Sequence, residues 1–501
     1  MAKGDELRFT PQLIITAALV LGLAPLLAFA VEQGSVPHFD RSLFFILSFT
    51  VKQAALSTFF SVLPGLLIAR ALARENFRGQ ALLLWLFALP MAMPAIVAVL
   101  GLIGLIGNSG LFPGLISPYG LAGILIVHVF FNLPMATRLI YQALQSTPEE
   151  ATKLSAQLGL SELQNFRHVE WPAVRAVLPQ LSAIIFLLCA ASFVVVLTLG
   201  GPAATTLEVA IFQSLRMDFE PPRALALSML QVALCAALIG FAQAAFSGDQ
   251  GFASLRAKAR QWQAPSALMR ILNFSQIAFG ALSILPVIGV IAWRGLNGFH
   301  FDARAAQALG TSLIMGFCSA TVALLLAWPL AKAQDKLSKL LSLAGLIVPP
   351  AVIATGWFLL VRRWSDSLLL TLCFIIALNA LMALPYAVAA LRGAQRRFTP
   401  FIKLQNQLGI SGLTALRVIE WPLLRSAFAQ AFLLAMVLSL GDLTAITLLG
   451  SNGILTLPTL LHAEMGHYRG QAADGTALLL LLPCGALTYV AQKVGSQNAD
   501  A

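Results

Sequence analysis

The feature that most constrains this chain is a succession of long, continuous apolar runs. Only 11% of its 501 residues are Asp, Glu, Lys or Arg, while 58% are apolar. An average soluble protein has about 25% charged residues and about 45–50% apolar ones. A helix of roughly 20 apolar residues can cross the hydrocarbon core of a bilayer. The sequence therefore excludes a soluble globular protein, a disordered chain and a secreted disulfide scaffold, and it predicts an all-α polytopic membrane protein.

Twelve of these runs are predicted as transmembrane helices, about six in each half of the chain, with turn residues between them. The first run follows basic residues and ends in Ala28-Phe29-Ala30, like a signal peptide, but its length favours a retained helix. The predicted spans are 12–30, 50–73, 80–106, 121–144, 176–200, 223–246, 270–293, 307–331, 340–361, 366–391, 424–449 and 474–492.

The basic residues predict the orientation of these spans. The chain has 32 Lys and Arg against 21 Asp and Glu, a formal net charge of +11. With the N-terminus inside, most Lys and Arg fall in the inner loops, whereas the acidic residues show no bias. The positive-inside rule then places both termini in the cytoplasm. Because these loops account for the basic excess, it does not indicate binding to nucleic acid.

An internal repeat divides the chain into two halves. Half of the positions in residues 156–175 are identical at 406–425, at a constant offset of 250 residues. Six spans separate the copies, so both halves cross the membrane in the same sense, related by a pseudo-twofold axis along the membrane normal. We predict a first half over 1–250, a cytoplasmic linker over 251–269 and a second half over 270–501.

The repeated segment lies in the predicted cytoplasmic loop after the fourth span of each half. Thr147-Pro148-Glu149-Glu150 predicts a helix start with Thr147 as its N-cap. Gly159 can adopt the positive φ that ends this helix, and Ser161 with Gln164 predicts a second capping box. The loop is therefore expected to be a helix, a sharp turn and a second short helix.

The second short helix is predicted to be amphipathic. Leu163, Phe166 and Val169 form an apolar stripe, and Arg167 with Glu170 has the spacing of an i, i+3 ion pair. Its short length favours docking into a groove of a cytoplasmic partner over lying in the lipid interface. The candidate docking residues are Gly159, Leu163, Phe166, Arg167 and Glu170, and in the second copy Gly409, Leu413, Leu416, Arg417 and Glu420.

The spacing of this loop resembles the EAA loop of binding-protein-dependent ABC importer permeases. It has a Gly, then an aromatic residue at +7, a branched aliphatic residue at +10 and a Pro at +13. The matching residues are Gly159, Phe166, Val169 and Pro172 in loop 147–172, and Gly409, Ile419 and Pro422 in loop 399–422, where Leu416 holds the aromatic place. Both copies depart from the Glu-Ala-Ala that gives the loop its name. Lys-Leu-Ser stands there at 153–155 and Lys-Leu-Gln at 403–405, so the role of that Glu is not carried over.

The whole chain is similar to the fused, double-length permeases of bacterial thiamine importers. The segments that resemble this family are Ser117–Gly120, His128–Pro134, Ala156–Gly159, Val169–Pro172, Thr206–Gln213 and Ala383–Tyr386. The fused iron(III) permeases share the architecture and remain an alternative. The resemblance implies a type I ABC importer fold with two tandem six-helix repeats in the bacterial inner membrane. It also implies two copies of an ATPase on the loops, a periplasmic binding protein, and thiamine or its phosphates as substrate.

The sequence offers no catalytic chemistry. It contains no phosphate-binding G-x-x-x-x-G-K-[ST] motif, so ATP hydrolysis is expected on a separate subunit. The five cysteines lack metal-ligand spacing, and His462 and His467 do not share a helical face as an i, i+4 pair would. We therefore predict a non-catalytic subunit that has neither a cofactor nor a metal site.

Four polar residues inside the apolar runs are candidates for the translocation path. Asp442 lies in the eleventh predicted span, and His128, Asn132 and Asn379 lie in the fourth span of each half. Intramembrane polar residues are costly and often functional, but they also hold helices together, and both interpretations stay open.

Two rival functions fit less well. A secondary transporter of the major-facilitator type would carry charges in mid-membrane and a basic loop between its second and third helices. A membrane enzyme would need a constellation of reactive groups at the membrane face. The sequence shows neither pattern.

Overall fold

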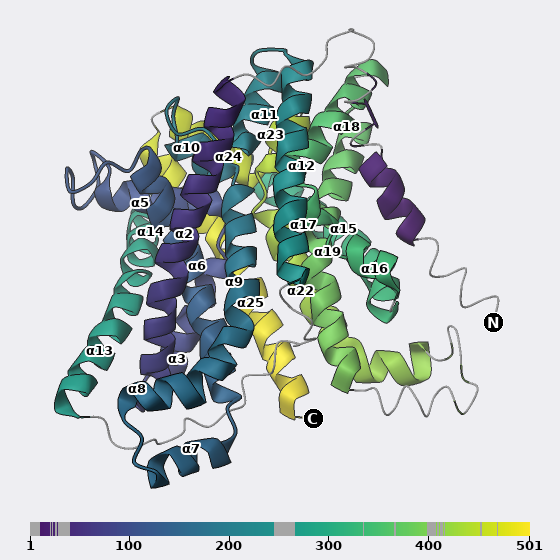
Figure 1. Ribbon diagram of the computed structural model, residues 1–501. Helices are drawn as coiled ribbons and strands as arrows, with labels where there is room; N and C mark the ends of the chain where they lie inside the picture. The colour runs from purple at the N-terminus through teal and green to yellow at the C-terminus, as the bar shows by residue number, and fades with distance from the viewer. Residues whose placement is uncertain are drawn as a thin grey trace.

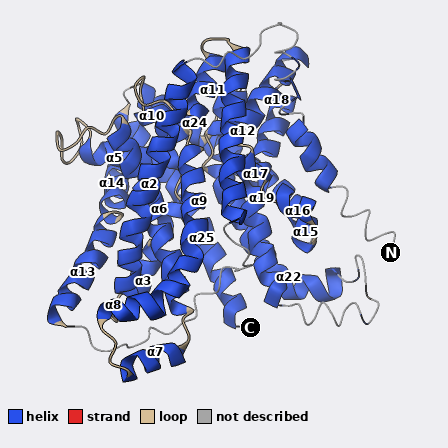
Figure 2. Ribbon diagram, in the orientation of Figure 1, coloured by secondary structure: helices blue, strands red, loops and turns tan. Residues whose placement is uncertain are grey.

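The computed structural model describes residues 11–20, 41–244, 266–333, 335–364, 367–397, 416–450, 453–467 and 469–500, with a few single residues between these ranges. These residues form helices, turns and loops, with no strand among them (Figure 2). Gly409 and Leu413 lie outside the described residues, and so does most of the linker predicted over 251–269.

Nine described helices are long and apolar enough to cross a membrane. They are Arg41–Arg74, Leu121–Gln145, Glu162–Ala190, Pro221–Phe241, Ala267–Asn297, Ala303–Lys332, Leu368–Gln395, Arg417–Leu440 and Gly470–Val494. A tenth candidate is the helix pair Gln80–Ala92 and Ala95–Ile106, which is bent by 110°. The chain is thus an all-helical polytopic membrane protein with nine or ten candidate spans in its described part.

Two of the twelve predicted spans are represented only by shorter apolar helices, Pro11–Val20 and Pro350–Leu360. The second of these runs is interrupted, because α17 (Ala344–Ile347) ends before the prolines at which α18 (Pro350–Trp364) begins. Proline lacks the N–H that a continuous helix would need at this point. Hydropathy alone had joined the two pieces into one span.

Two series of helices follow one another along the chain, and from α2 (Arg41–Arg74) and from α15 (Ala303–Lys332) onward they run in the same order (Figure 1). The first series is α2 (Arg41–Arg74), α3 (Gln80–Leu86), α4 (Leu89–Ala92), α5 (Ala95–Ile106), α6 (Leu121–Gln145), α9 (Trp171–Ala190), α10 (Val194–Leu199), α11 (Leu207–Arg216) and α12 (Pro221–Ala244). The second is α13 (Ala267–Leu282), α14 (Leu285–Asn297), α15 (Ala303–Lys332), α16 (Lys336–Leu341), α17, α18, α19 (Leu368–Arg397), α22 (Trp421–Leu440), α23 (Thr444–Leu449), α24 (Leu457–Gly466) and α25 (Gly470–Asp500).

Each series is built around three mutually packed helices: α2, α6 and α9 in the first, and α15, α19 and α22 in the second. The two units share a specific polar contact. The Thr50 hydroxyl accepts a hydrogen bond from the Leu207 N–H at 3.0 Å, and the Ser312 hydroxyl accepts one from the Leu457 N–H at 2.9 Å. In both units a buried hydroxyl on the long helix thus satisfies the start of the short helix α11 or α24.

Helices of the second series also pack on the first: α13 packs on α2, and α14 packs on α5. Gly101 and Gly104 on α5 permit the close approach of α14. A Cβ added at Gly101 would lie 2.7 Å from Ile291 Cδ1 and 2.8 Å from Val287 Cγ1. Small residues at such crossings let membrane helices pack through van der Waals contact.

We expect Gly101→Leu to lower the free energy of unfolding by about 1–3 kcal/mol, the usual cost of overpacking a close contact. Gly289→Leu on α14 is the matched control, because a Cβ at Gly289 meets nothing within 4 Å. Thermal unfolding in detergent, followed by size-exclusion chromatography, measures the difference. Equal midpoints for the two variants would contradict the role of Gly101 in this crossing.

Candidate functional site

The repeated loop forms a compact helical segment at one end of the bundle, opposite to α10 and α11 (Figure 1). In the first copy it consists of α7 (Glu149–Gln157), α8 (Glu162–Asn165) and the π-helix η1 (Phe166–Glu170), which leads directly into α9. We refer to residues 149–170 as the α7–α8 segment. The second π-helix, η2 (Leu416–Glu420), leads into α22 in the same way.

Two predictions about the turn in this segment are confirmed. Gly159 has φ +61°, so the residue that ends α7 needs the left-handed conformation that glycine adopts without strain. Ser161 caps α8: its hydroxyl accepts from the Gln164 N–H, and the Gln164 Oε1 accepts from the Ser161 N–H at 2.9 Å. Both features depend on neighbouring residues only, which is why the sequence could show them.

The predicted start of α7 is wrong by one residue. The N-cap is Pro148, with extended backbone angles, and its side chain makes no cap hydrogen bond. Thr147 is buried, and its Oγ1 has no hydrogen-bond partner among the described residues. Proline disfavours helical backbone angles for the residue before it. The N-cap position predicted for Thr147 is therefore held by Pro148 itself.

The predicted ion pair between Arg167 and Glu170 is also wrong. Glu170 is buried and accepts from Arg70 Nε at 2.7 Å and Arg74 Nη2 at 2.7 Å, both on α2. Arg167 is exposed and forms no ion pair with any described residue. The reason is the π-helical turn, whose wider spacing moves residues three apart off a common face and turns Glu170 toward α2.

The second copy holds its glutamate in an equivalent way. Glu420 is buried, and both of its carboxylate oxygens lie 2.6 Å from the Lys332 ammonium at the end of α15. Arg417 is exposed and, like its counterpart, is not the partner of this glutamate in the described structure. Of Leu416 only the backbone is described.

The predicted apolar stripe does not lie on a single face. Leu163 is 75% exposed, whereas Phe166 and Val169 are half-buried, with the Phe166 ring against Trp171 and under the Arg70 guanidinium at 5.0 Å. Leu154 on α7 and Leu158 at its C-cap are also exposed. The α7–α8 segment therefore presents leucines outward and uses its aromatic residue to attach to the bundle.

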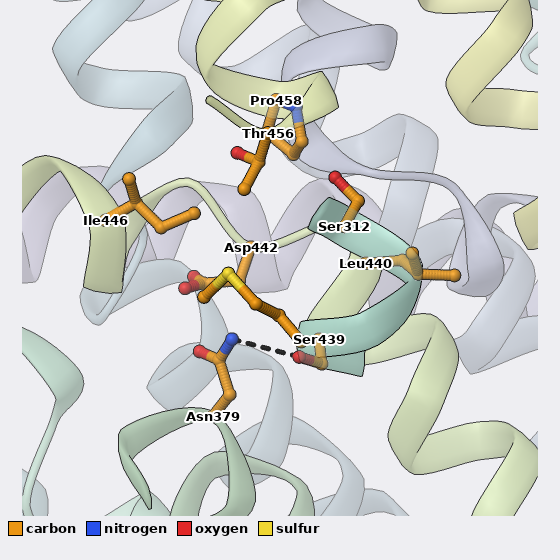
Figure 3. Close-up of a pocket in the computed structure, with 9 residues that line it drawn as sticks. Ser312, Asn379, Ser439, Leu440, Asp442, Ile446, Thr456 and Pro458 are labelled. Carbon is orange, nitrogen blue, oxygen red and sulfur yellow. Dashed lines mark hydrogen bonds between the residues drawn. The ribbon is translucent and has the colours of Figure 1, made fainter. Parts of the chain in front are cut away.

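The second-series candidates Asn379 and Asp442 line one small pocket (Figure 3). The Asn379 amide donates to the Ser439 hydroxyl at 3.0 Å. The Asp442 carboxylate accepts from the backbone N–H groups of Thr444 and Ala445, each at 3.0 Å. Asp442 precedes Leu443, the N-cap of α23, and thus satisfies two N–H groups in the first turn of this helix, although it also faces the pocket.

The first-series candidates His128 and Asn132 lie one turn apart on α6, close to the end of α9. The His128 Nδ1 lies 3.0 Å from the Ser57 hydroxyl, and the Asn132 amide donates to the Cys189 sulfur at 3.3 Å. The four candidates therefore form two separate pairs, one in each series. Sequence reasoning missed Glu208 of α11, which is fully buried; the available signal was a single acidic residue inside an apolar helix.

Among the described residues, no group of three or more His, Cys, Asp or Glu side chains could hold a metal ion. His462 lies in α24 and His467 at its C-cap. The described cysteines are free.

The model of the binding-protein-dependent transport system inner membrane component family matches residues 61–247. The thiamine transport system permease protein ThiP of Brucella abortus (strain 2308) is 40% identical over 95% of this chain and 93% of its own length. ThiP of Escherichia coli (strain K12) is 37% identical over 92% and 90%, respectively. The Fe(3+)-transport system permease protein FbpB 2 of Haemophilus influenzae is 26% identical over 89% of each chain. The chain belongs to the family of thiamine transport system permease proteins, inner membrane components of binding-protein-dependent transport systems.

Proposed function

We propose that this chain is the membrane-spanning subunit of an ABC importer that carries thiamine or its phosphates across the inner membrane. Its 40% identity to a thiamine permease over nearly its whole length carries the proposal, against 26% to an iron(III) permease. As a permease component it is a non-catalytic transport subunit. ATP binding and hydrolysis belong to a separate ATPase, and substrate is delivered by a periplasmic binding protein.

The proposed architecture is a type I importer fold of two six-helix halves, residues 1–250 and 270–501, with both termini in the cytoplasm and twelve spans in total. Three observations support it: the 250-residue repeat, the recurrence of α9–α11 as α22–α24 at that offset, and the paired hydroxyl contacts of Thr50 and Ser312. With this orientation, the α7–α8 segment lies on the cytoplasmic face.

The α7–α8 segment and its second copy are the proposed docking sites for two ATPase subunits. The exposed leucines supply apolar area for a groove on the partner, as a short amphipathic helix does in such recognition. The ion pairs of Glu170 and Glu420 attach each segment to the long helix of its own half. Closure of the ATPase pair would then move both helix bundles as rigid bodies and expose the central path to alternate sides.

Uptake measurements test the substrate. A deletion strain without any other thiamine transporter should lose uptake of labelled thiamine and regain it when this chain is expressed with its ATPase and binding protein. Uptake should stop when the ATPase carries an inactivating substitution in its phosphate-binding lysine. Unimpaired thiamine uptake in the deletion strain would contradict the proposal, and restored iron(III) uptake in its place would support the iron alternative.

A further inference from the structure

A cluster of polar side chains is buried where α9 ends in the first half. Its members are Gln53 on α2, Thr206 and Glu208 at the start of α11, and Gln231 on α12; each of the four is 0% exposed. The Gln53 amide donates to the Cys189 carbonyl at 2.8 Å. The Gln231 amide donates to the Ala190 carbonyl at 3.4 Å and to Glu208 Oε1 at 3.5 Å. We call these four residues the acceptor cluster.

The acceptor cluster has more acceptors than donors. Both amide groups already donate, and no described residue donates to Gln53 Oε1, Thr206 Oγ1, Glu208 Oε2 or Gln231 Oε1. No described cation forms an ion pair with Glu208. An unsatisfied buried polar group costs about 1–3 kcal/mol, and an unpaired charge costs more. Four such atoms in residues that surround the end of α9 are expensive for stability alone. Together they match a ligand that brings positive charge and N–H donors.

The cluster lies at the seam between the two halves. The Glu208 carboxylate is close to the backbone N–H of Ala351, in the first turn of α18 of the second half. α11 packs on α18, and α12 packs on both α17 and α18, the two pieces of the helix broken at Pro349 and Pro350. Transporter substrate sites commonly form at the interface between repeats, beside interrupted helices. Rocking of the halves would open this seam.

The carboxylate of the cluster has no equivalent in the second half. At the repeat offset of 250 residues, Thr206 corresponds to Thr456, but Glu208 corresponds to Pro458, which lines the pocket of Figure 3. Asp442 in that pocket already uses both carboxylate oxygens for the start of α23. The two halves therefore bring different charges to the seam between them, which suits a cation that carries its charge at one end.

We propose that Glu208 is a specificity-determining residue of the translocation path, which binds the cationic ring of the substrate while the amide and hydroxyl oxygens of the acceptor cluster accept from its amino group. This inference rests on the proposed function, since thiamine carries one quaternary nitrogen and one aminopyrimidine. A carboxylate in a low-dielectric seam favours a cation over a neutral molecule of the same shape.

The test compares Glu208→Gln with the unchanged chain in proteoliposomes that contain the complete importer and its binding protein. Uptake is measured for thiamine and for a neutral analogue in which carbon replaces the quaternary nitrogen. The preference of an importer is its uptake of thiamine divided by its uptake of the neutral analogue. Because the binding protein is the same in both preparations, a difference between their preferences is due to residue 208. We expect the preference for thiamine to fall about tenfold or more, through a raised KM for thiamine. Glu220→Gln, at an exposed acid before α12, should leave it unchanged.

A preference that stays within about twofold in Glu208→Gln would overturn the inference, while wild-type uptake of thiamine would still uphold the proposed function. Absence of thiamine uptake by the wild-type importer would instead refute the proposed function. If Glu208→Gln does not assemble, Glu208→Asp takes its place: the shorter side chain withdraws the carboxylate from the ring, so a fall in the preference supports the inference and an unchanged preference overturns it.

Discussion

Replacement of Leu163 with glutamate is expected to abolish co-purification of the ATPase without destabilising the permease. Leu163 is 75% exposed, so its removal leaves no cavity, and surface changes of this kind usually cost less than about 0.5 kcal/mol. In a docked complex the same position would bury an unpaired charge and lose about 1.5–3 kcal/mol of apolar burial. Affinity should fall by about two orders of magnitude, measured by titration of the purified ATPase onto the permease in nanodiscs.

Met217→Glu is the control for this experiment. Met217 is 60% exposed but lies directly after α11, at the end of the bundle opposite to the α7–α8 segment. This variant should bind the ATPase normally. If Leu163→Glu retains wild-type affinity, or if Met217→Glu loses as much, the α7–α8 segment is not the docking site.

Removal of the Glu170 side chain should cause the largest loss of stability and of coupling. Its carboxylate holds both Arg70 and Arg74, and the Arg74 side chain is only 7% exposed. Removing one partner of a buried ion pair costs about 3–5 kcal/mol. Glu162 still contacts both arginines, but its side chain is 47% exposed, so it offsets only part of this cost. Glu170→Ala should therefore lower the thermal midpoint strongly and lower transport-coupled ATP hydrolysis in the protein that survives purification.

Two matched variants distinguish this ion pair from ordinary surface charge. Glu162 also contacts Arg74, but its side chain is 47% exposed, so Glu162→Ala should cost about 1 kcal/mol or less. Glu420→Ala removes a single contact to Lys332, whose side chain is 38% exposed and can extend to water, and it should have an intermediate effect. Equal losses of stability in all three variants would show that burial does not make the Glu170 contact more stabilising than the exposed ones.

The effect on coupling follows from what Glu170 joins. Arg70 and Arg74 lie in the last turns of α2, which packs on both α6 and α9. A movement imposed on the α7–α8 segment is therefore transmitted to three helices together. Without the carboxylate, the segment would remain attached to the bundle through the exposed Glu162 contacts to Arg70 and Arg74, through Phe166 and through the π-helical entry to α9.

Features of the chain that depend on neighbours in sequence were predictable. The apolar runs predicted membrane helices, Gly159 predicted a left-handed turn and Ser161 predicted a helix cap. The repeat at 250 residues predicted two helical series in the same order. These signals are local or periodic, and a single chain displays them directly.

Contacts between distant segments were decided only in the tertiary structure. Glu170 takes partners 96 and 100 residues away in place of the arginine three positions before it, because a π-turn faces it toward α2. Glu208 reads in sequence as one acid among apolar residues, and only packing of α11 against α12 and α18 buries it without a cation. The sequence by itself determined the membrane class, the repeat and the turn chemistry, since these follow from hydropathy and backbone preference. Which charges are paired and which are left open depends on the distances that packing sets between helices far apart in the chain.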